Sequence, residues 1–172
     1  SWDQVLNLNG PYDAPALSFA QGYVFAQGNL IRQAAQAFER ARQQATNDVT
    51  SRLWLGQLNL NQNFPDRTIE LVAEIRQIAE RVPGLSTNLN DLFTLEAAAY
   101  LSKNQDAIAQ RIIETNLANR PDDFNILASA CKAYADNGRH SNALAINERM
   151  LKLAPDNVAC WINQGCFQIE LP

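Results

Sequence analysis

The sequence predicts an all-α fold in which one helical hairpin is copied and stacked into a solenoid. Slots for bulky residues, small residues, tyrosines and prolines recur with a constant separation of 34 residues in the C-terminal half. The positions are Phe93, Leu127 and Trp161; Ala97, Cys131 and Gly165; Tyr100 and Tyr134; and Pro121 and Pro155. A period in the thirties, with its slots in constant order, is typical of helical hairpins that bury their apolar faces against one another.

The N-terminal part follows the same pattern. Residues 2–14, which include Trp2, are expected to be the end of a preceding repeat. Copy one spans residues 15–48 and matches through Gly22, Phe25, Ile31, Ala34, Phe38 and Ala41.

Copy two, residues 49–89, is irregular because its 41 residues exceed the period by seven. We expect three extra residues before its second helix and four after Pro83. Pro65 followed by Asp66 predicts the start of that helix, since proline loses nothing at the first helical position.

Copies three and four span residues 90–123 and 124–157, and residues 158–172 fill a first-helix slot of a fifth copy. The chain therefore reads as part of a longer array. Asn104 and Gly138 tolerate the positive φ that a tight helix end requires, so they predict the hairpin turns. Three aspartates after the prolines are candidate caps of the next helices: Asp122, Asp123 and Asp156.

Copy four carries Leu127, Cys131, Tyr134, Gly138, His140, Ala143, Met150, Leu151 and Pro155 at fixed offsets. This order resembles the tetratricopeptide repeat. The resemblance covers the chain from Pro15 to about Ile169 and is weakest in copy two. It implies a right-handed α-solenoid of antiparallel helix-turn-helix repeats and a role in binding proteins or peptides, without naming the partner.

Composition argues against some classes of partner. The chain has 14 Lys and Arg against 18 Asp and Glu, so no basic stripe is present to neutralise the phosphates of a nucleic acid. Apolar stretches are too short to cross a bilayer, which argues against membrane insertion. The sequence specifies no compartment, and the cytoplasm is our default expectation.

No pattern of catalytic, cofactor-binding or metal-binding residues is recognisable. Cys131, Cys160 and Cys166 lack the pairing of metal sites and are expected to be buried free thiols. His140 is the only histidine and is interpreted as structural, because no nucleophile motif accompanies it. We therefore expect no enzyme activity, cofactor or metal.

The resemblance implies that a partner lies against the first helices, on the concave face. Nine candidate contacts follow: Phe19, Tyr23, Leu53, Trp54, Gln57, Leu60, Asn61, Leu101 and Lys132. Phe19 and Tyr23 stand where the carboxylate-binding subgroup of the family carries Lys and Asn, so recognition of a terminal carboxylate is disfavoured. Trp54 has two interpretations. Its register turns it toward the groove, whereas a local register shift in the irregular second copy would place it in the core, as most aromatic side chains are.

The leading hypothesis is a protein-interaction scaffold that binds an amphipathic partner segment. Apolar side chains would supply affinity, and amides would bind the partner's backbone. In the alternative hypothesis the chain is a regulatory or docking domain of a larger enzyme. Two further expectations remain open: neighbouring repeats could cover the groove, and exposed terminal repeats could self-associate.

Overall fold

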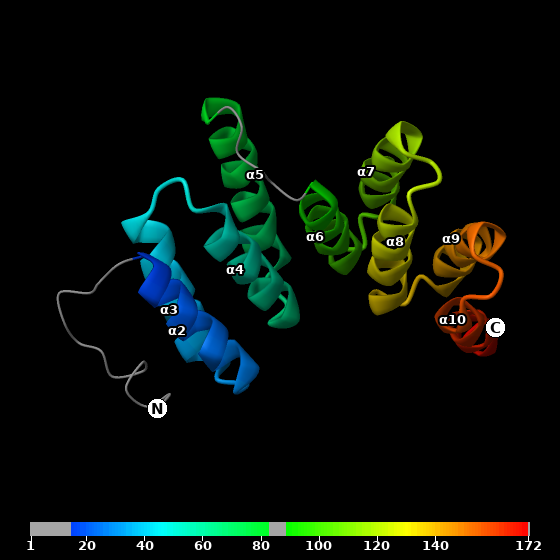
Figure 1. The fold of residues 1–172 in the computed structure, drawn as a ribbon, viewed down its shortest axis with the longest axis horizontal. Coiled ribbons are helices and arrows are strands. Elements are labelled where there is room, and N and C mark those ends of the chain that lie inside the picture. Colours follow the sequence, from blue (N-terminus) through cyan, green and yellow to red (C-terminus); the bar gives the residue numbers. More distant parts are fainter. Residues whose placement is uncertain (1–14, 83–88, 172) are drawn as a thin grey trace. The chain divides into compact units, whose positions relative to one another are not determined.

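A computed structural model describes residues 15–82 and 89–171. These residues form nine α-helices, and no strand occurs among them (Figure 1). The predicted segment 2–14, with Trp2, and residues 83–88 lie outside the described residues. The expected all-α fold of antiparallel helical hairpins is confirmed.

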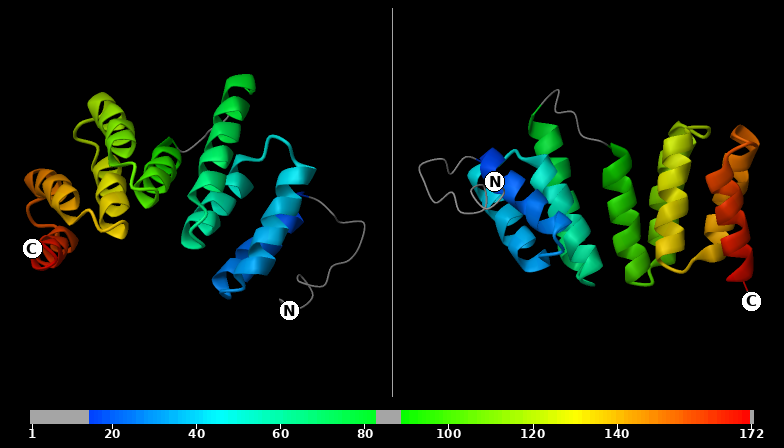
Figure 2. Two further views of the ribbon diagram at one scale, coloured as in Figure 1. Left: turned by 180° about the vertical axis from the view of Figure 1, so that it is seen from behind. Right: turned by 60° about the horizontal axis from the view of Figure 1, so that its bottom comes forward.

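The chain divides into two compact units, residues 1–87 and residues 88–172, and the described part of unit 1 consists of two hairpins. α2 (Pro15–Gln27) pairs with α3 (Ile31–Gln44), and α4 (Val49–Asn61) pairs with α5 (Pro65–Arg81). The two helices of each hairpin lie side by side (Figure 2), and α3 packs against α4. The second helix of one hairpin therefore joins it to the first helix of the next.

Unit 2 consists of two hairpins and a single helix. α6 (Leu89–Ser102) pairs with α7 (Asp106–Asn119), and α8 (Phe124–Asp136) pairs with α9 (His140–Leu153). α10 (Val158–Ile169) packs against α9. Helices α6 and α8 also contact each other, so these two first helices are neighbours.

Every hairpin turn contains one residue with positive φ. Gly138 has φ 70° and Asn104 has φ 56°, which confirms both predicted turns. Asn29 and Asn63, with φ of 56° and 61°, occupy the same place in the first two hairpins and were not predicted. Asparagine tolerates the left-handed region better than most residues, so it can replace glycine where the chain must reverse.

Side-chain caps start three of the first helices. Asp48 and Asp123 each accept hydrogen bonds from two backbone N–H groups in the first turn of α4 and α8. The expected role of Asp123 is thus confirmed. At α10 the cap is Asn157, and not Asp156 as expected, because Asn157 is the residue directly before the helix. Each cap satisfies N–H groups that have no partner within the helix.

The extra residues of copy two do not lie where the sequence pattern predicts. α5 begins 34 residues after α3, at Pro65 against Ile31, so nothing is inserted before it. Instead α5 itself is longer, with 17 residues against 14 in α3. The rest of the surplus falls between the end of α5 and the start of α6.

Small residues occupy the helix crossings of unit 2. Ala97, Ala109 and Ala143 are completely buried, and Cys131 is buried with them in one apolar core. The repeated small slots therefore allow close contact between helices, as their spacing predicted.

Unit 1 has a tighter crossing at Gly22. A Cβ atom added there would lie 2.6 Å from the ring of Phe38, which is completely buried in α3. Gly165 in α10 is different, because an added Cβ would meet nothing within 4 Å.

These two glycines form a matched pair for mutation. Gly22→Ala should destabilise the fold by about 1–3 kcal/mol, because the methyl group must displace a packed aromatic ring. Gly165→Ala should be neutral or stabilising by up to about 1 kcal/mol, because alanine favours the helix. Urea denaturation followed by circular dichroism measures both. Equal stability of the two variants would contradict the described contact between Gly22 and Phe38.

Candidate functional site

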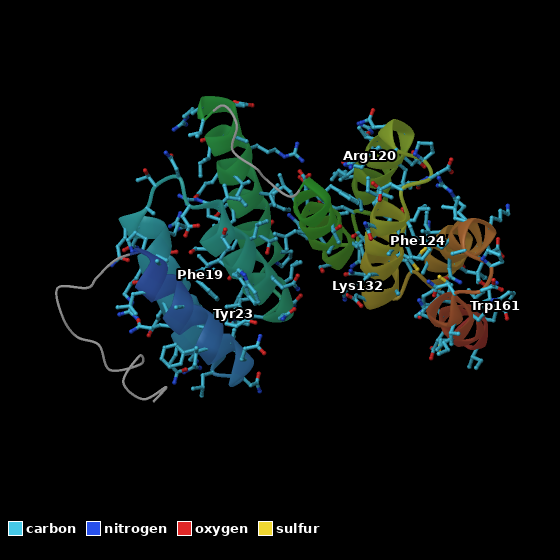
Figure 3. All side chains as sticks on the ribbon, in the orientation of Figure 1. Phe19, Tyr23, Arg120, Phe124, Lys132 and Trp161 are labelled. Carbon is cyan, nitrogen blue, oxygen red and sulfur yellow. The ribbon has the colours of Figure 1, made fainter. Side chains whose placement is uncertain are left out.

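Seven of the nine predicted contact residues lie on the first helices of unit 1. We call them the α2–α4 patch: Phe19, Tyr23, Leu53, Trp54, Gln57, Leu60 and Asn61. Phe19 and Tyr23 lie one helical turn apart on α2 (Figure 3). The other five lie on α4. Tyr23, Gln57 and Asn61 are exposed, and the remaining four are half-buried, so the patch is accessible to a partner.

A chain of aromatic rings connects the patch to the core. Phe38 contacts Phe19 at a ring-centroid distance of 5.5 Å and stacks on Trp54 at 5.7 Å. Trp54 in turn meets Tyr23 edge to face, at 5.4 Å and 84°. Trp54 thus packs against the core, as one of its two interpretations predicts, and it also contacts the 44% exposed Tyr23.

The polar members of the patch lie on one stripe of α4. The amide nitrogen of Gln57 donates a hydrogen bond of 3.1 Å to the side-chain oxygen of Asn61. This bond orients both amides and leaves the oxygen of Gln57 and the nitrogen of Asn61 for other partners. None of the seven residues carries a charge.

The predicted contact Leu101 is not accessible. Its side chain is only 2% exposed and belongs to the core of unit 2. α6 packs against α8, so the face of α6 that turns toward α8 is covered. Leu101 therefore cannot contact a partner directly.

Lys132, the ninth predicted residue, is exposed on α8 (Figure 3) and forms an ion pair with Asp136 one turn later. Both border a hollow of about 300 Å³ between α8, α9 and α10. Its apolar lining includes Ala128, Met150 and Phe167. The first-helix face of unit 2 thus offers room for one or two apolar side chains.

A larger hollow of about 780 Å³ lies between α3, α4 and α5 and contains none of the predicted residues. Its wall carries an ion-pair network. Arg42 binds Glu39 and Glu74 at 2.7 and 2.9 Å, and the buried Arg52 binds Glu74 at 2.9 Å. This network connects all three helices.

The network shifts the pKa values of Glu39 and Arg42. Partial burial alone would raise the pKa of Glu39, but hydrogen bonds from Arg42 and Gln43 outweigh it and hold the pKa below 4.5. The hydrogen bond to Glu39 raises the pKa of Arg42, with a smaller contribution from Glu74. The folded unit therefore favours the charged forms of both groups.

The cysteines and the histidine of the described residues all lie in unit 2. Cys131 and Cys160 are buried free thiols as expected, whereas Cys166 is exposed. Burial, with a smaller effect of Cys160, raises the pKa of Cys131 to about 11. His140 packs near Phe167, with 6.2 Å between ring centroids, in agreement with a structural role.

Residues 15–82 and 89–171 provide neither a metal site nor a membrane span. They contain no group of three or more His, Cys, Asp or Glu side chains placed to hold a metal ion. Within the same ranges, no helix combines the length and apolar character needed to span a bilayer.

By sequence, the chain matches no family model and no curated protein. By structure, it is similar to several solved repeat proteins. TTC0263, a TPR protein of Thermus thermophilus, has a TM-score of 0.69 at 12% identity, covering 96% of this chain and 85% of that one. YrrB, described as a TPR protein with an unusual peptide-binding site, has a TM-score of 0.60 at 12% identity, with coverage of 98% and 82%. MamA from Desulfovibrio magneticus RS-1 has a TM-score of 0.63 at 14% identity, with coverage of 90% and 84%.

The chain has a tetratricopeptide-repeat (TPR) fold. In TPR terms, α2, α4, α6, α8 and α10 are first helices, and α3, α5, α7 and α9 are second helices. The α2–α4 patch lies on first helices, and first helices also provide most of the lining of the hollow beside Lys132. The hollow of about 780 Å³, whose wall carries the ion-pair network, is lined mainly by second helices.

Sequence reasoning missed two features of this TPR chain. The ring of Phe38 underlies the patch, although its own position on α3 gave no indication of this. The ion-pair network was also missed, because it joins side chains of three helices that lie far apart in the sequence.

The network predicts a pH dependence of stability. Since the pKa of Glu39 is lower in the folded unit than the ordinary 4.5, its carboxylate stabilises the fold above that pH. This contribution disappears as the pH falls through the folded-state pKa. Glu39→Gln should therefore remove under about 1 kcal/mol near neutral pH and almost nothing in acid.

Glu70→Gln is the control for this prediction, because Glu70 borders the same hollow and makes no ion pair with a described residue. Urea midpoints measured between about pH 3 and pH 7 compare the two variants. An identical pH dependence for Glu39→Gln and Glu70→Gln would exclude a stabilising role for the Glu39 carboxylate.

Proposed function

We propose that this chain is a protein-interaction scaffold that binds a partner segment on its first-helix surfaces. The observation that carries the proposal is the α2–α4 patch, in which an exposed tyrosine is held against a tryptophan that itself stacks on the core. Aromatic side chains with few rotatable bonds supply much of the binding energy at protein interfaces. The patch therefore has the composition of a binding surface.

Two further observations support the proposal. The patch carries exposed amides at Gln57 and Asn61, which can bind the backbone of a partner and set its direction. The TPR fold is shared with YrrB, which is described as having a peptide-binding site. Apolar anchors on the partner would contact the rings and the half-buried Leu53 and Leu60.

The absence of charge on the patch favours apolar anchors over a terminal carboxylate. A carboxylate would lose its hydration on binding and find no cationic side chain among the seven patch residues. In unit 2 the Lys132 ammonium group is already paired with Asp136. A partner side chain could still enter the apolar hollow beside it.

Tyr23→Ser tests the proposal. We expect it to weaken binding of the native partner about 30-fold, because it removes an exposed aromatic anchor while leaving the core intact. Partners retained on the immobilised chain are identified by mass spectrometry, and their affinities are then measured with the purified polypeptide.

Phe64→Ser is the matched control. Phe64 is 49% exposed, close to the 44% of Tyr23, but lies at the turn before α5 and outside the patch. Its substitution should leave binding unchanged, and both variants should retain helical circular dichroism. If Tyr23→Ser bound every retained partner as tightly as Phe64→Ser does, the binding surface would lie elsewhere.

A further inference from the structure

The two aromatic rings at the surface of unit 1 meet at nearly a right angle, and we call the corner between them the notch. The ring planes of Tyr23 and Trp54 are inclined by 84°, with 5.4 Å between centroids. Trp54 cannot turn away freely, because its other side stacks on Phe38, which is completely buried. The notch is therefore formed before a ligand arrives, which lowers the entropy cost of binding.

Three hydrogen-bond donors of the patch have no acceptor among the described residues. The indole N–H of Trp54 and the hydroxyl of Tyr23 bind no group among residues 15–82 and 89–171. The amide nitrogen of Asn61 also has no acceptor among these residues, since only its oxygen is bound, by Gln57. A ligand with free acceptors next to an apolar surface would bind these donors and would also pack against the two rings.

The conformation of the ligand decides whether it offers such acceptors. A helical segment has most of its carbonyl groups bound within its own backbone. A polyproline II segment has no internal hydrogen bonds, so its carbonyl oxygens remain available. Its proline rings also pack well against aromatic surfaces, and its stiffness reduces the cost of ordering.

The absence of charged side chains among the patch residues further limits the class of ligand that the patch can bind. All seven patch residues are uncharged, so an acidic or basic segment would lose hydration without gaining an ion pair. An uncharged segment avoids this penalty. A segment made mainly of proline carries no charge, has free carbonyl oxygens and presents flat apolar rings.

We propose that the α2–α4 patch recognises an extended, uncharged, proline-rich segment of a partner, with a proline ring in the Tyr23–Trp54 notch and a ligand carbonyl on the Trp54 indole N–H. This inference rests on the proposed function and names the class of segment that the patch takes. It requires only residues of unit 1.

The experiment titrates the chain with capped decaproline and follows the indole N–H signals by nitrogen-proton correlation spectroscopy. The Trp54 signal is assigned by its loss in Trp54→Phe. It should shift saturably, whereas the Trp161 indole should not move, because that N–H donates to the carbonyl of Pro155 at 2.7 Å.

Variants separate the indole hydrogen bond from general apolar contact. Trp54→Phe keeps a ring that can stack on Phe38 but removes the donor, so the affinity for decaproline should fall about tenfold. Tyr23→Leu, which removes one wall of the notch, should weaken binding at least as much. Phe64→Leu is the control and should bind normally, and circular dichroism verifies that each variant is folded.

A second probe distinguishes failure of this inference from failure of the proposed function. It is a capped, uncharged peptide of leucine, alanine and glutamine, with leucines at helical spacing. If it shifts the Trp54 signal and decaproline does not, the patch binds a helix, the proline-rich inference is overturned, and the proposed function stands. If neither peptide shifts the signal, or if Trp161 shifts equally, the inference is also overturned. The partner-binding test with Tyr23→Ser then decides the proposed function separately.

Discussion

The contact between Gly22 and the ring of Phe38 is the constraint on which the surface of unit 1 depends. Without a side chain at Gly22, α2 and α3 approach closely enough for the ring to lie directly against the helix. The same ring stacks on Trp54 of the next hairpin. One buried side chain therefore joins two helices within a hairpin and also joins that hairpin to its neighbour.

This arrangement links packing to function. A tryptophan at a protein surface normally samples several rotamers, and ordering it on binding costs free energy. In unit 1 much of that cost is met on folding, because Trp54 is held between Phe38 and Tyr23. The proposed binding surface is thus an extension of the hydrophobic core.

The two units stabilise their hairpins in different ways. In unit 1, Arg42, Glu74 and Arg52 connect three helices through ion pairs, and the hydroxyl of the buried Thr68 donates to the carbonyl of Gly56. In unit 2 the buried Asn147 donates to the carbonyl of Cys160, which connects α9 to α10. Repeated apolar slots determine the common fold, and these polar contacts differ from repeat to repeat.

Much of the fold could be predicted because it depends on local and periodic features. Gly138 and Asn104 were recognised as turns, and the equivalent Asn29 and Asn63 were available in the same pattern. Leu101 was placed wrongly because a stripe on an isolated helix cannot show that α6 is covered by α8. The ring stack through Phe38 was beyond sequence reasoning, since it depends on side-chain orientations across three helices.

The most direct test of the central claim is the mobility of the Trp54 indole in the unliganded chain. Nitrogen relaxation of the indole N–H measures its order parameter on the picosecond to nanosecond timescale. If Phe38 and Tyr23 hold the ring before a partner binds, the order parameter should be near that of rigid backbone, about 0.85. A value below about 0.6 would show a freely moving side chain and would contradict the claim that the core preorganises this surface.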